Sequence, residues 1–316
     1  MPVKMAVRSV ILFTFMSLCI CLLLFADFGK SSSLFLDKIL DLGHVPLFAV
    51  VAGMTLWALD RENWLHADKR THVHAFALSA AMALATEIIQ HFTPERSFQI
   101  GDIVKDVIGS AVFLQIAYQY KRELPGWKRL AMSSTAAVLL LAASVPALVA
   151  YADELRARHD FPLLGSFETC GEMERWQIEE GLFKRVRMHA TQGEFSLEAN
   201  LPPGLYPGIT MDYPPRDWRG YNTLTFNAFL EDTGPLTLTV RINDLEHNEE
   251  IDDRYNRTFV LQPGRNHVIV NLSEVEHAPK GRLMDMEHIS MICIFSYKLK
   301  KPRTVYFDNF RLEKNG

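Results

Sequence analysis

The chain has 316 residues, enough for two domains of ordinary size, and 48% of the residues are hydrophobic. Its formal net charge of −4 lacks the basic excess of nucleic-acid-binding proteins, so nucleic acid is not expected as a partner. Four cysteines are too few for a disulfide framework. The apolar residues are concentrated in the first half, which predicts two parts of different kinds.

Five segments approach the roughly 20 apolar residues that a membrane-spanning helix needs. They are Val10–Phe25, Leu42–Leu59, Val73–Ile89, Ile103–Tyr120 and Leu130–Ala150. The first resembles a signal peptide because Lys4 and Arg8 precede it, but no small-x-small cleavage site follows, which favours an uncleaved span. Residues 1–151 are therefore predicted to form a helical transmembrane bundle, with the lipid bilayer as its partner.

The basic residues predict the orientation of this bundle. Most of them lie before the first span, between the second and third, and between the fourth and fifth. By the positive-inside rule these loops and the N-terminus are cytoplasmic. An odd number of spans then places everything after Tyr151 on the outer side of the membrane.

Ionisable side chains inside spans are costly and usually face the bundle interior or a water-filled cavity. Here the polar residues gather at the outer ends of the second, third and fourth spans. Helical spacing puts Glu87 and Gln90 on one face, and Asp102, Asp106 and Gly109 on another. The predicted polar cluster comprises Asp37, Lys38, His44, Glu87, Gln90, Arg96, Ser97, Asp102 and Asp106.

Two interpretations of this polar cluster remain open. It either locks three helices together through mutual hydrogen bonds, or it lines an outward-facing pocket for a polar headgroup or cell-envelope precursor. In the second case neighbouring acids would suit general acid–base chemistry, with Arg96 closing over them. The catalytic candidates are then Glu87, Arg96, Asp102 and Asp106.

The pattern Glu87-x2-Gln90-x3-Pro94-x-Arg96-Ser97-x4-Asp102-x6-Gly109, preceded by Asp37-Lys38 and His44, resembles the VanZ family over residues 35–120. This sequence has Asp106 where the family typically has Asn, and its His after Asp-Lys is differently placed. The resemblance implies a multi-pass protein of the bacterial inner (cytoplasmic) membrane with a role in the envelope. It also implies a link to glycopeptide antibiotic tolerance, after the resistance to teicoplanin for which the family is named.

Residues 152–162 form a charged stretch that is expected to be a linker to a second domain at 163–316. In that domain the hydrophobic period becomes two. The expected strands include Thr223–Leu230, Leu236–Ile242, His267–Leu272, Ile289–Phe295 and Val305–Leu312, and Phe195, Leu197 and Ala199 alternate in another. Many short strands separated by Pro-Gly turns predict an antiparallel β-sandwich of the jelly-roll kind, on the periplasmic or extracellular side.

The order of motifs from Phe167-Glu168 to the closing Val305-Tyr306-Phe307-Asp308 resembles the galactose-binding-like jelly rolls of carbohydrate-binding modules. That resemblance implies a structural calcium ion, for which Glu168 and Asp308 stand at the matching positions. Calcium takes six to eight oxygen ligands, so two carboxylates supply only part of a site.

Two groups of residues are candidates for binding a glycan in this domain. Trp218 and Tyr221 could provide an aromatic platform, with packing of the sandwich edge as the alternative. The run from Arg241 to Arg257 is expected to form a polar loop, either merely solvated or suited to a polyol or carboxylate. Its candidate ligand residues are Asp244, His247, Asp253, Arg254 and Asn256. Whether Cys170 and Cys293 pair is left open.

The favoured function is a membrane-bound envelope protein that binds a glycan, a glycolipid or a cell-wall component. A membrane enzyme acting on a lipid-linked or cell-wall substrate is the first alternative, and a structural or assembly protein is the second. The sequence has no recognisable nucleophile motif, phosphate loop or zinc spacing, which favours binding over catalysis. The sequence does not identify a protein partner.

Overall fold

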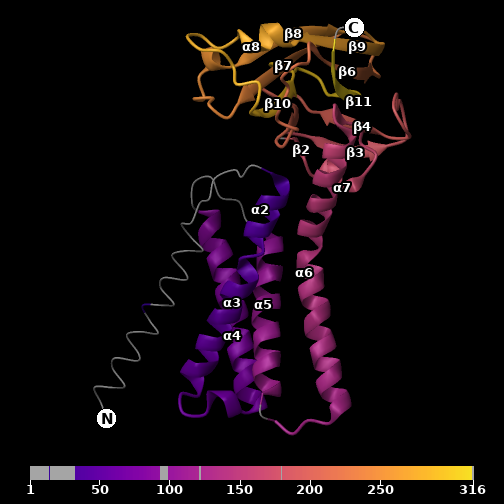
Figure 1. Ribbon diagram of the computed structural model, residues 1–316. Coiled ribbons are helices and arrows are strands. Elements are labelled where there is room, and N and C mark those ends of the chain that lie inside the picture. Colours follow the sequence, from indigo (N-terminus) through magenta and orange to yellow (C-terminus); the bar gives the residue numbers. More distant parts are fainter. Residues whose placement is uncertain (1–13, 15–32, 93–98, 121, 179, 315–316) are drawn as a thin grey trace. The chain divides into compact units, whose positions relative to one another are not determined.

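The computed structural model describes residue 14 and residues 33–92, 99–120, 122–178 and 180–314 (Figure 1). It contains two compact units, a helical one that ends at Leu148 and a β-rich one that runs from Val149 to Gly316. The predicted combination of a helical region with an antiparallel β-sandwich is confirmed. The predicted first span, Val10–Phe25, lies outside the described residues.

The described helices of the first unit pack side by side in Figure 1, with α3, α4 and α5 in mutual contact. Asp68 begins α4 because its carboxylate accepts a hydrogen bond from the N–H of Thr71 at 2.7 Å and so caps the helix. The elements are α2 Leu34–Asp41, α3 His44–Leu59, the 3₁₀ turn η1 Trp64–His66, α4 Lys69–His91, α5 Ile100–Gln119 and α6 Gly126–Asp160.

Three stretches of the described chain are long and apolar enough to cross a membrane: Leu34–Leu59, Lys69–His91 and Gly126–Asp160. They contain the second, third and fifth predicted spans. The fourth predicted span, Ile103–Tyr120, is helical as α5 but is not among them. The reason is that the first two turns of α5 carry three charged residues, Asp102, Lys105 and Asp106.

Helices α3 and α5 approach each other most closely at Gly109. A Cβ atom on Gly109 would lie 2.1 Å from the carbonyl oxygen of Val45, so only glycine fits there. Gly53 of α3 plays a similar part, because its Cβ would lie 2.7 Å from the ring of Phe113. Small residues at such crossings allow the backbones of membrane helices to pack closely.

The substitution Gly109→Ala should therefore destabilise the helical unit by about 1–3 kcal/mol through overpacking. The matched control is Gly101→Ala in the same helix, where an added Cβ meets nothing within 4 Å. Thermal unfolding of the detergent-solubilised protein, followed by circular dichroism at the helical signal, measures both. Equal melting temperatures for the two variants would contradict the close packing of α3 on α5.

The β-rich unit consists of two antiparallel sheets. The larger sheet has the order β3-β4-β11-β6-β9, with β1 also paired to β11, and the smaller has the order β2-β5-β10-β7-β8. The strands are β1 Leu163–Gly165, β2 Trp176–Ile178, β3 Leu182–Val186, β4 Ser196–Leu201, β5 Gly208–Met211, β6 Thr223–Leu230, β7 Leu236–Asp244, β8 Tyr255–Leu261, β9 Gly264–Asn271, β10 Ile289–Phe295 and β11 Arg303–Glu313, with short helices α7 Cys170–Met173, η2 Ile251–Asp253 and α8 Leu272–Glu276.

The core lies between the inner faces of the two sheets. In β6, for example, Phe226, Ala228 and Leu230 are buried, whereas Asn227 and Phe229 between them point to the outer face. This alternation is the period-two pattern of the sequence, and it decides which side chains of each strand are available to a ligand. Cys170 is exposed in α7 and Cys293 is half-buried in β10, and they do not form a disulfide.

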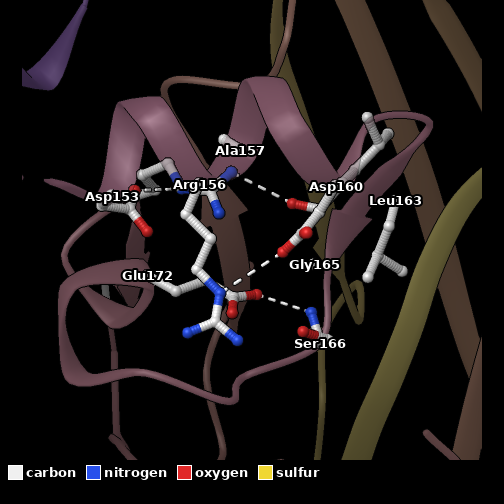
Figure 2. Close-up of a pocket in the computed structure, with 10 residues that line it drawn as sticks. Asp153, Arg156, Ala157, Asp160, Leu163, Gly165, Ser166 and Glu172 are labelled. Atoms are coloured by element: carbon white, nitrogen blue, oxygen red, sulfur yellow. Dashed lines mark hydrogen bonds and ion pairs between the residues drawn. The ribbon is translucent and has the colours of Figure 1, made fainter.

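Residues 152–160, expected as a linker, continue helix α6, and the part of the helix from Val149 belongs to the β-rich unit. The carboxylate of Asp153 lies 2.8 Å from the guanidinium of Arg175, and both side chains are buried. Glu172 is buried beside this pair and accepts hydrogen bonds from the N–H groups of Ser166 and Phe167. Figure 2 shows this junction, with Asp153 on the helix and Glu172 on the segment that follows it.

Replacing Arg175 by Met should leave the Asp153 carboxylate buried without its cation and destabilise the β-rich unit by about 3–5 kcal/mol. The control is Arg158→Ala, which removes an exposed pair with Glu154 on the same helix and should cost no more than about 1 kcal/mol. Urea unfolding followed by the β signal in circular dichroism gives both values. A small effect of Arg175→Met would show that the ion pair does not hold the helix end.

Candidate functional site

Three members of the polar cluster in the helical unit, Glu87, Asp102 and Asp106, lie around His44 at the start of α3. Its Nδ1 lies 2.9 Å from Oδ1 of Asp106, and its Nε2 lies 3.9 Å from Oδ2 of Asp102. Lys105 pairs with Asp102 at 2.7 Å and with Asp41 at 3.5 Å. Contacts of His44 with Asp102 and Asp106 therefore join α3 to α5, and the pair of Lys105 with Asp41 joins α5 to α2.

Glu87 of α4 completes the cluster from the third side. Its side chain is 1% exposed, accepts a hydrogen bond from the N–H of Gln99 at 2.9 Å, and interacts electrostatically with Asp102 and His44. Gln90 is buried one turn further on, and Asp37 and Lys38 lie in α2.

These pairings agree with the interpretation that the polar cluster holds the helices together through mutual hydrogen bonds and ion pairs. Each of His44, Glu87, Asp102 and Asp106 has a partner on another segment, and the cost of burying them is offset by those partners. Arg96 and Ser97 lie outside the described residues, so their part in a catalytic pocket stays a prediction.

In the β-rich unit, the polar run expected to form a loop is largely part of two strands. Arg241–Asp244 belongs to β7 and Tyr255–Arg257 to β8, so only the residues between them connect the strands. Asn256 and Arg254 line an open cavity of about 420 Å³. Arg257 pairs there with Glu274, and Lys280 pairs with Asp252 at 2.6 Å.

Two acids of this run, Asp244 and Asp253, are buried around Arg282, a residue that the sequence pattern does not identify as a candidate. The guanidinium of Arg282 contacts the carboxylate of Asp244 at 2.6 and 2.9 Å and that of Asp253 at 2.6 and 3.0 Å. Asp244 also accepts a hydrogen bond from the N–H of Asp285, and the buried His247 contacts the carbonyl oxygen of Asp253. Asp244, His247 and Asp253 thus stabilise the end of the sandwich and are not free to grip a ligand.

The aromatic candidates also differ from a sugar platform. Trp218 is 0% exposed, and its indole N–H donates to the carbonyl oxygen of Pro215 at 2.7 Å, so it belongs to the core. Tyr221 is half-buried and packs edge-on against Phe161, with Lys314 over its ring. Both line an open cavity of about 540 Å³, but neither presents a free ring face.

Glu168 and Asp308 hold a turn. Oδ2 of Asp308 accepts hydrogen bonds from the N–H of Thr191 at 2.5 Å, from its hydroxyl at 2.9 Å and from the N–H of Gln192 at 2.8 Å. Oε1 of Glu168 accepts the N–H groups of residues 194 and 195, both at 2.9 Å. Burial raises the pKa of Asp308, and these donors oppose that rise.

Hydrogen-bond donors thus occupy both oxygens of Asp308 and Oε1 of Glu168, which a calcium ion would need as ligands. The described part of the chain contains no group of three or more His, Cys, Asp or Glu side chains able to hold a metal, so these residues do not fit calcium in this arrangement.

The turn that these acids hold forms one wall of a hollow on the outer face of the larger sheet, here called the outer-face groove. It has a volume of about 260 Å³. Strands β6, β9 and β11 form its floor. Its lining comprises His189, Thr191, Asn227, Ala228, Phe229, Arg265, Asn266, His267 and Tyr306.

Three rings form the apolar part of the outer-face groove. The imidazole of His189 stacks on the ring of Phe229, with centroids 3.5 Å apart and planes inclined by 9°. The ring of Tyr306 meets His189 edge-on at 4.6 Å, and its hydroxyl donates to Glu231 at 3.1 Å. Burial raises the pKa of Tyr306 to about 12, so the phenol is neutral at physiological pH.

The polar part of the groove is a chain of amide and imidazole groups. Nδ2 of Asn227 donates to the hydroxyl of Thr191 at 3.0 Å, and its Oδ1 lies 3.0 Å from Nδ1 of His267. His189 has a φ of +58°, a backbone conformation that non-glycine residues rarely adopt. Such strain persists only where the surroundings enforce it, and here Asp308 holds the turn that follows.

The sequence alone does not identify this groove, although the alternation of one strand indicates part of it. In Thr223–Leu230 the alternation places Asn227 and the aromatic Phe229 on the face opposite the core, where an aromatic side chain is unexpected. The remaining lining residues come from distant segments, and only the sheet order brings them together.

Comparisons with known proteins find similarity only in solved structures. No family model and no curated protein matches the chain. The resemblance of residues 35–120 to the VanZ family therefore stays a prediction.

Solved structures similar to the chain include a family 11 carbohydrate-binding module from Clostridium thermocellum in complex with a beta-1,3-1,4-mixed-linked tetrasaccharide. It is 17% identical, with a TM-score of 0.39, over 48% of this chain and 94% of the module. A CBM22-2 xylan-binding domain from Paenibacillus barcinonensis Xyn10C is 13% identical, with a TM-score of 0.35, over 49% of this chain and 99% of that domain.

An exo-beta-agarase is 13% identical, with a TM-score of 0.40, over 49% of this chain but only 25% of the enzyme. Because these TM-scores lie below 0.5, the β-sandwich is assigned here from its strand pairing, and no ligand is inferred from the similarity.

The pairing of Asp253 with Arg282 makes the stability of the β-rich unit depend on pH. The hydrogen bonds from Arg282 lower the pKa of Asp253 to about 2. A carboxyl whose pKa is lowered by folding stabilises the native state above its ordinary pKa of about 3.9, and loses that contribution as the pH falls. The melting temperature should therefore fall between pH 4 and pH 2, and Asp253→Asn should flatten this fall.

The control for this prediction is Asp252→Asn, which changes the adjacent exposed acid and should leave the pH profile close to that of the unchanged protein. Scanning calorimetry at several pH values measures all three proteins. Identical profiles for Asp253→Asn and the unchanged protein would contradict the role of this ion pair.

Proposed function

We propose that this chain is an envelope protein that binds a glycan through the outer-face groove of its β-rich unit. The observation that carries the proposal is the combination, in one open hollow, of an aromatic stack with amide, hydroxyl and imidazole groups. Small-molecule sites typically join apolar and aromatic surface with a few placed polar groups. Figure 1 shows the strands that carry most of these residues, β6, β9 and β11, whereas His189 and Thr191 lie between β3 and β4.

A sugar ring has one face of C–H groups and a rim of hydroxyls, and the groove offers a partner for each. The His189–Phe229 stack, which lines the groove, suits the C–H face. Asn227 keeps one Nδ2 hydrogen, and the Oδ1 atoms of Asn227 and Asn266 each keep a lone pair, which match hydroxyl groups that both donate and accept. The two rings are held by packing, so a ligand orders few side chains on binding.

The helical unit would anchor this binding domain in a bacterial cytoplasmic membrane. The proposal includes a cytoplasmic N-terminus and a β-rich unit outside the cytoplasm. Its support is the presence of three stretches apolar enough to span a membrane and the concentration of basic residues in alternate loops. A glycan, glycolipid or cell-wall component would then be within reach of the β-rich unit. The resemblance to the VanZ family connects such a role with tolerance of glycopeptide antibiotics.

Truncation of the aromatic stack tests the proposal. Phe229→Ala should weaken binding of the glycan about tenfold or more, because a loss of about 1.4 kcal/mol is tenfold in affinity and an aromatic contact is worth a comparable amount. The control is Tyr297→Ala, which removes an exposed ring that does not line the groove. The full-length protein in detergent is first screened on an array of bacterial envelope glycans, and the affinities of the hits are then measured by calorimetry.

Binding that is unchanged in Phe229→Ala but lost in Tyr297→Ala would place the site elsewhere and refute the groove. A full-length protein that binds no glycan on the array would refute the proposed function itself. Circular dichroism of each variant confirms that the sandwich is folded in every comparison.

A further inference from the structure

The charges around the outer-face groove are of one sign. Of the nine residues that line it, three carry basic groups, namely His189, Arg265 and His267, and none is an acid. Elsewhere in the β-rich unit Arg282, Arg257 and Lys280 each pair with a carboxylate. The groove thus presents the guanidinium of Arg265 with no acid in its lining.

Among the described residues of the unit, Arg265 has no carboxylate partner, as is also true of Arg185, Arg254 and Arg311, and of these four it is the one that lines the groove. Arg219, Arg257 and Arg303 are each within 4.0 Å of a carboxylate oxygen. Arg265 is exposed at the start of β9, and among the described residues no carboxylate lies within ion-pair distance of its guanidinium. A planar guanidinium without an acid partner is suited to bind an anionic group with two parallel hydrogen bonds.

The neighbouring His267 leaves one ring nitrogen for a ligand. Since Nδ2 of Asn227 donates to Thr191, the Oδ1 atom of Asn227 faces Nδ1 of His267, and Nδ1 must therefore carry the hydrogen. The other nitrogen of this exposed side chain, Nε2, then accepts a hydrogen bond, for example from a sugar hydroxyl.

The acids nearest to the groove are already engaged. Asp308 lies behind the turn, where its oxygens accept the N–H groups of the turn. Glu231 accepts the hydroxyl of Tyr306, and Glu198 contacts Lys184 and Asn200. None of them lines the groove. A ligand in the groove would therefore contact the guanidinium of Arg265 and no carboxylate of the lining.

We infer that the ligand of the outer-face groove is an anionic glycan, one whose sugar carries a carboxylate or phosphate group. Arg265 binds the anionic group, Nε2 of His267 accepts a hydrogen bond from a hydroxyl, and the sugar ring lies against the stack of His189 on Phe229. This inference rests on the proposed glycan-binding function and adds the charge of the ligand to it. A neutral glycan would leave the guanidinium of Arg265 without an ionic partner.

The test compares three ligands of similar length with the full-length protein in detergent. They are an oligogalacturonate trimer, the matching neutral galactose trimer, and a glycerol phosphate oligomer, each measured by calorimetry at low and at high salt. The expected result is that at least one anionic ligand binds about tenfold or more tightly than the neutral trimer. Its affinity should fall at high salt, because screening weakens the exposed ion pair. The two anionic arms distinguish a carboxylate from a phosphate.

Arg265→Gln should remove this preference, so that the anionic and neutral ligands bind within about twofold of each other, whereas Arg219→Gln outside the groove should preserve it. Equal binding of the neutral and anionic ligands by the unchanged protein would overturn the inference and leave glycan binding intact. A preference that survives Arg265→Gln would also overturn it. Failure to bind these ligands and every glycan on the array would instead overturn the proposed function.

Discussion

A carboxylate buried in a sheet needs hydrogen-bond donors, and this requirement at Asp308 shapes the outer face of the β-rich unit. Asp308 lies in β11, between β4 and β6, where the register of the ladder shifts. Its oxygens take their donors from the turn at 191–192 and from the N–H of Asn309, which has a φ of +57°. Local distortion of the strand and the path of a distant turn therefore depend on one buried charge.

The consequence extends to the ring stack. The turn that Asp308 holds carries His189 over Phe229 and brings the hydroxyl of Thr191 to Asn227. Asp308, which the resemblance to carbohydrate-binding modules predicts as a calcium ligand, here binds backbone N–H groups of the turn. Asp308 thereby connects β11, the last strand, to the turn at 191–192 between β3 and β4, and joins parts of the sandwich that lie far apart in the sequence.

Much of the fold could be predicted from the sequence because buried residues recur at a regular spacing along each strand or helix. The bounds of β6 and β10 agree with the predicted Thr223–Leu230 and Ile289–Phe295, since both strands alternate clearly. The site could not be predicted in the same way. Polar residues in and beside β7 looked like a loop because their partner Arg282 lies 38 residues from Asp244 and 29 from Asp253. A pattern read along the chain carries no information on such long-range ion pairs.

The boundary between the two units has a practical meaning. The β-rich unit does not begin at the first strand, because Asp153 on the preceding helix neutralises the buried Arg175. Gly171 packs against Val149 of the same helix, where a side chain would not fit easily. A secreted fragment cut at residue 160 would carry a buried cation without its anion. The shortest self-sufficient fragment should therefore retain the last three turns of α6 and start at or before Val149.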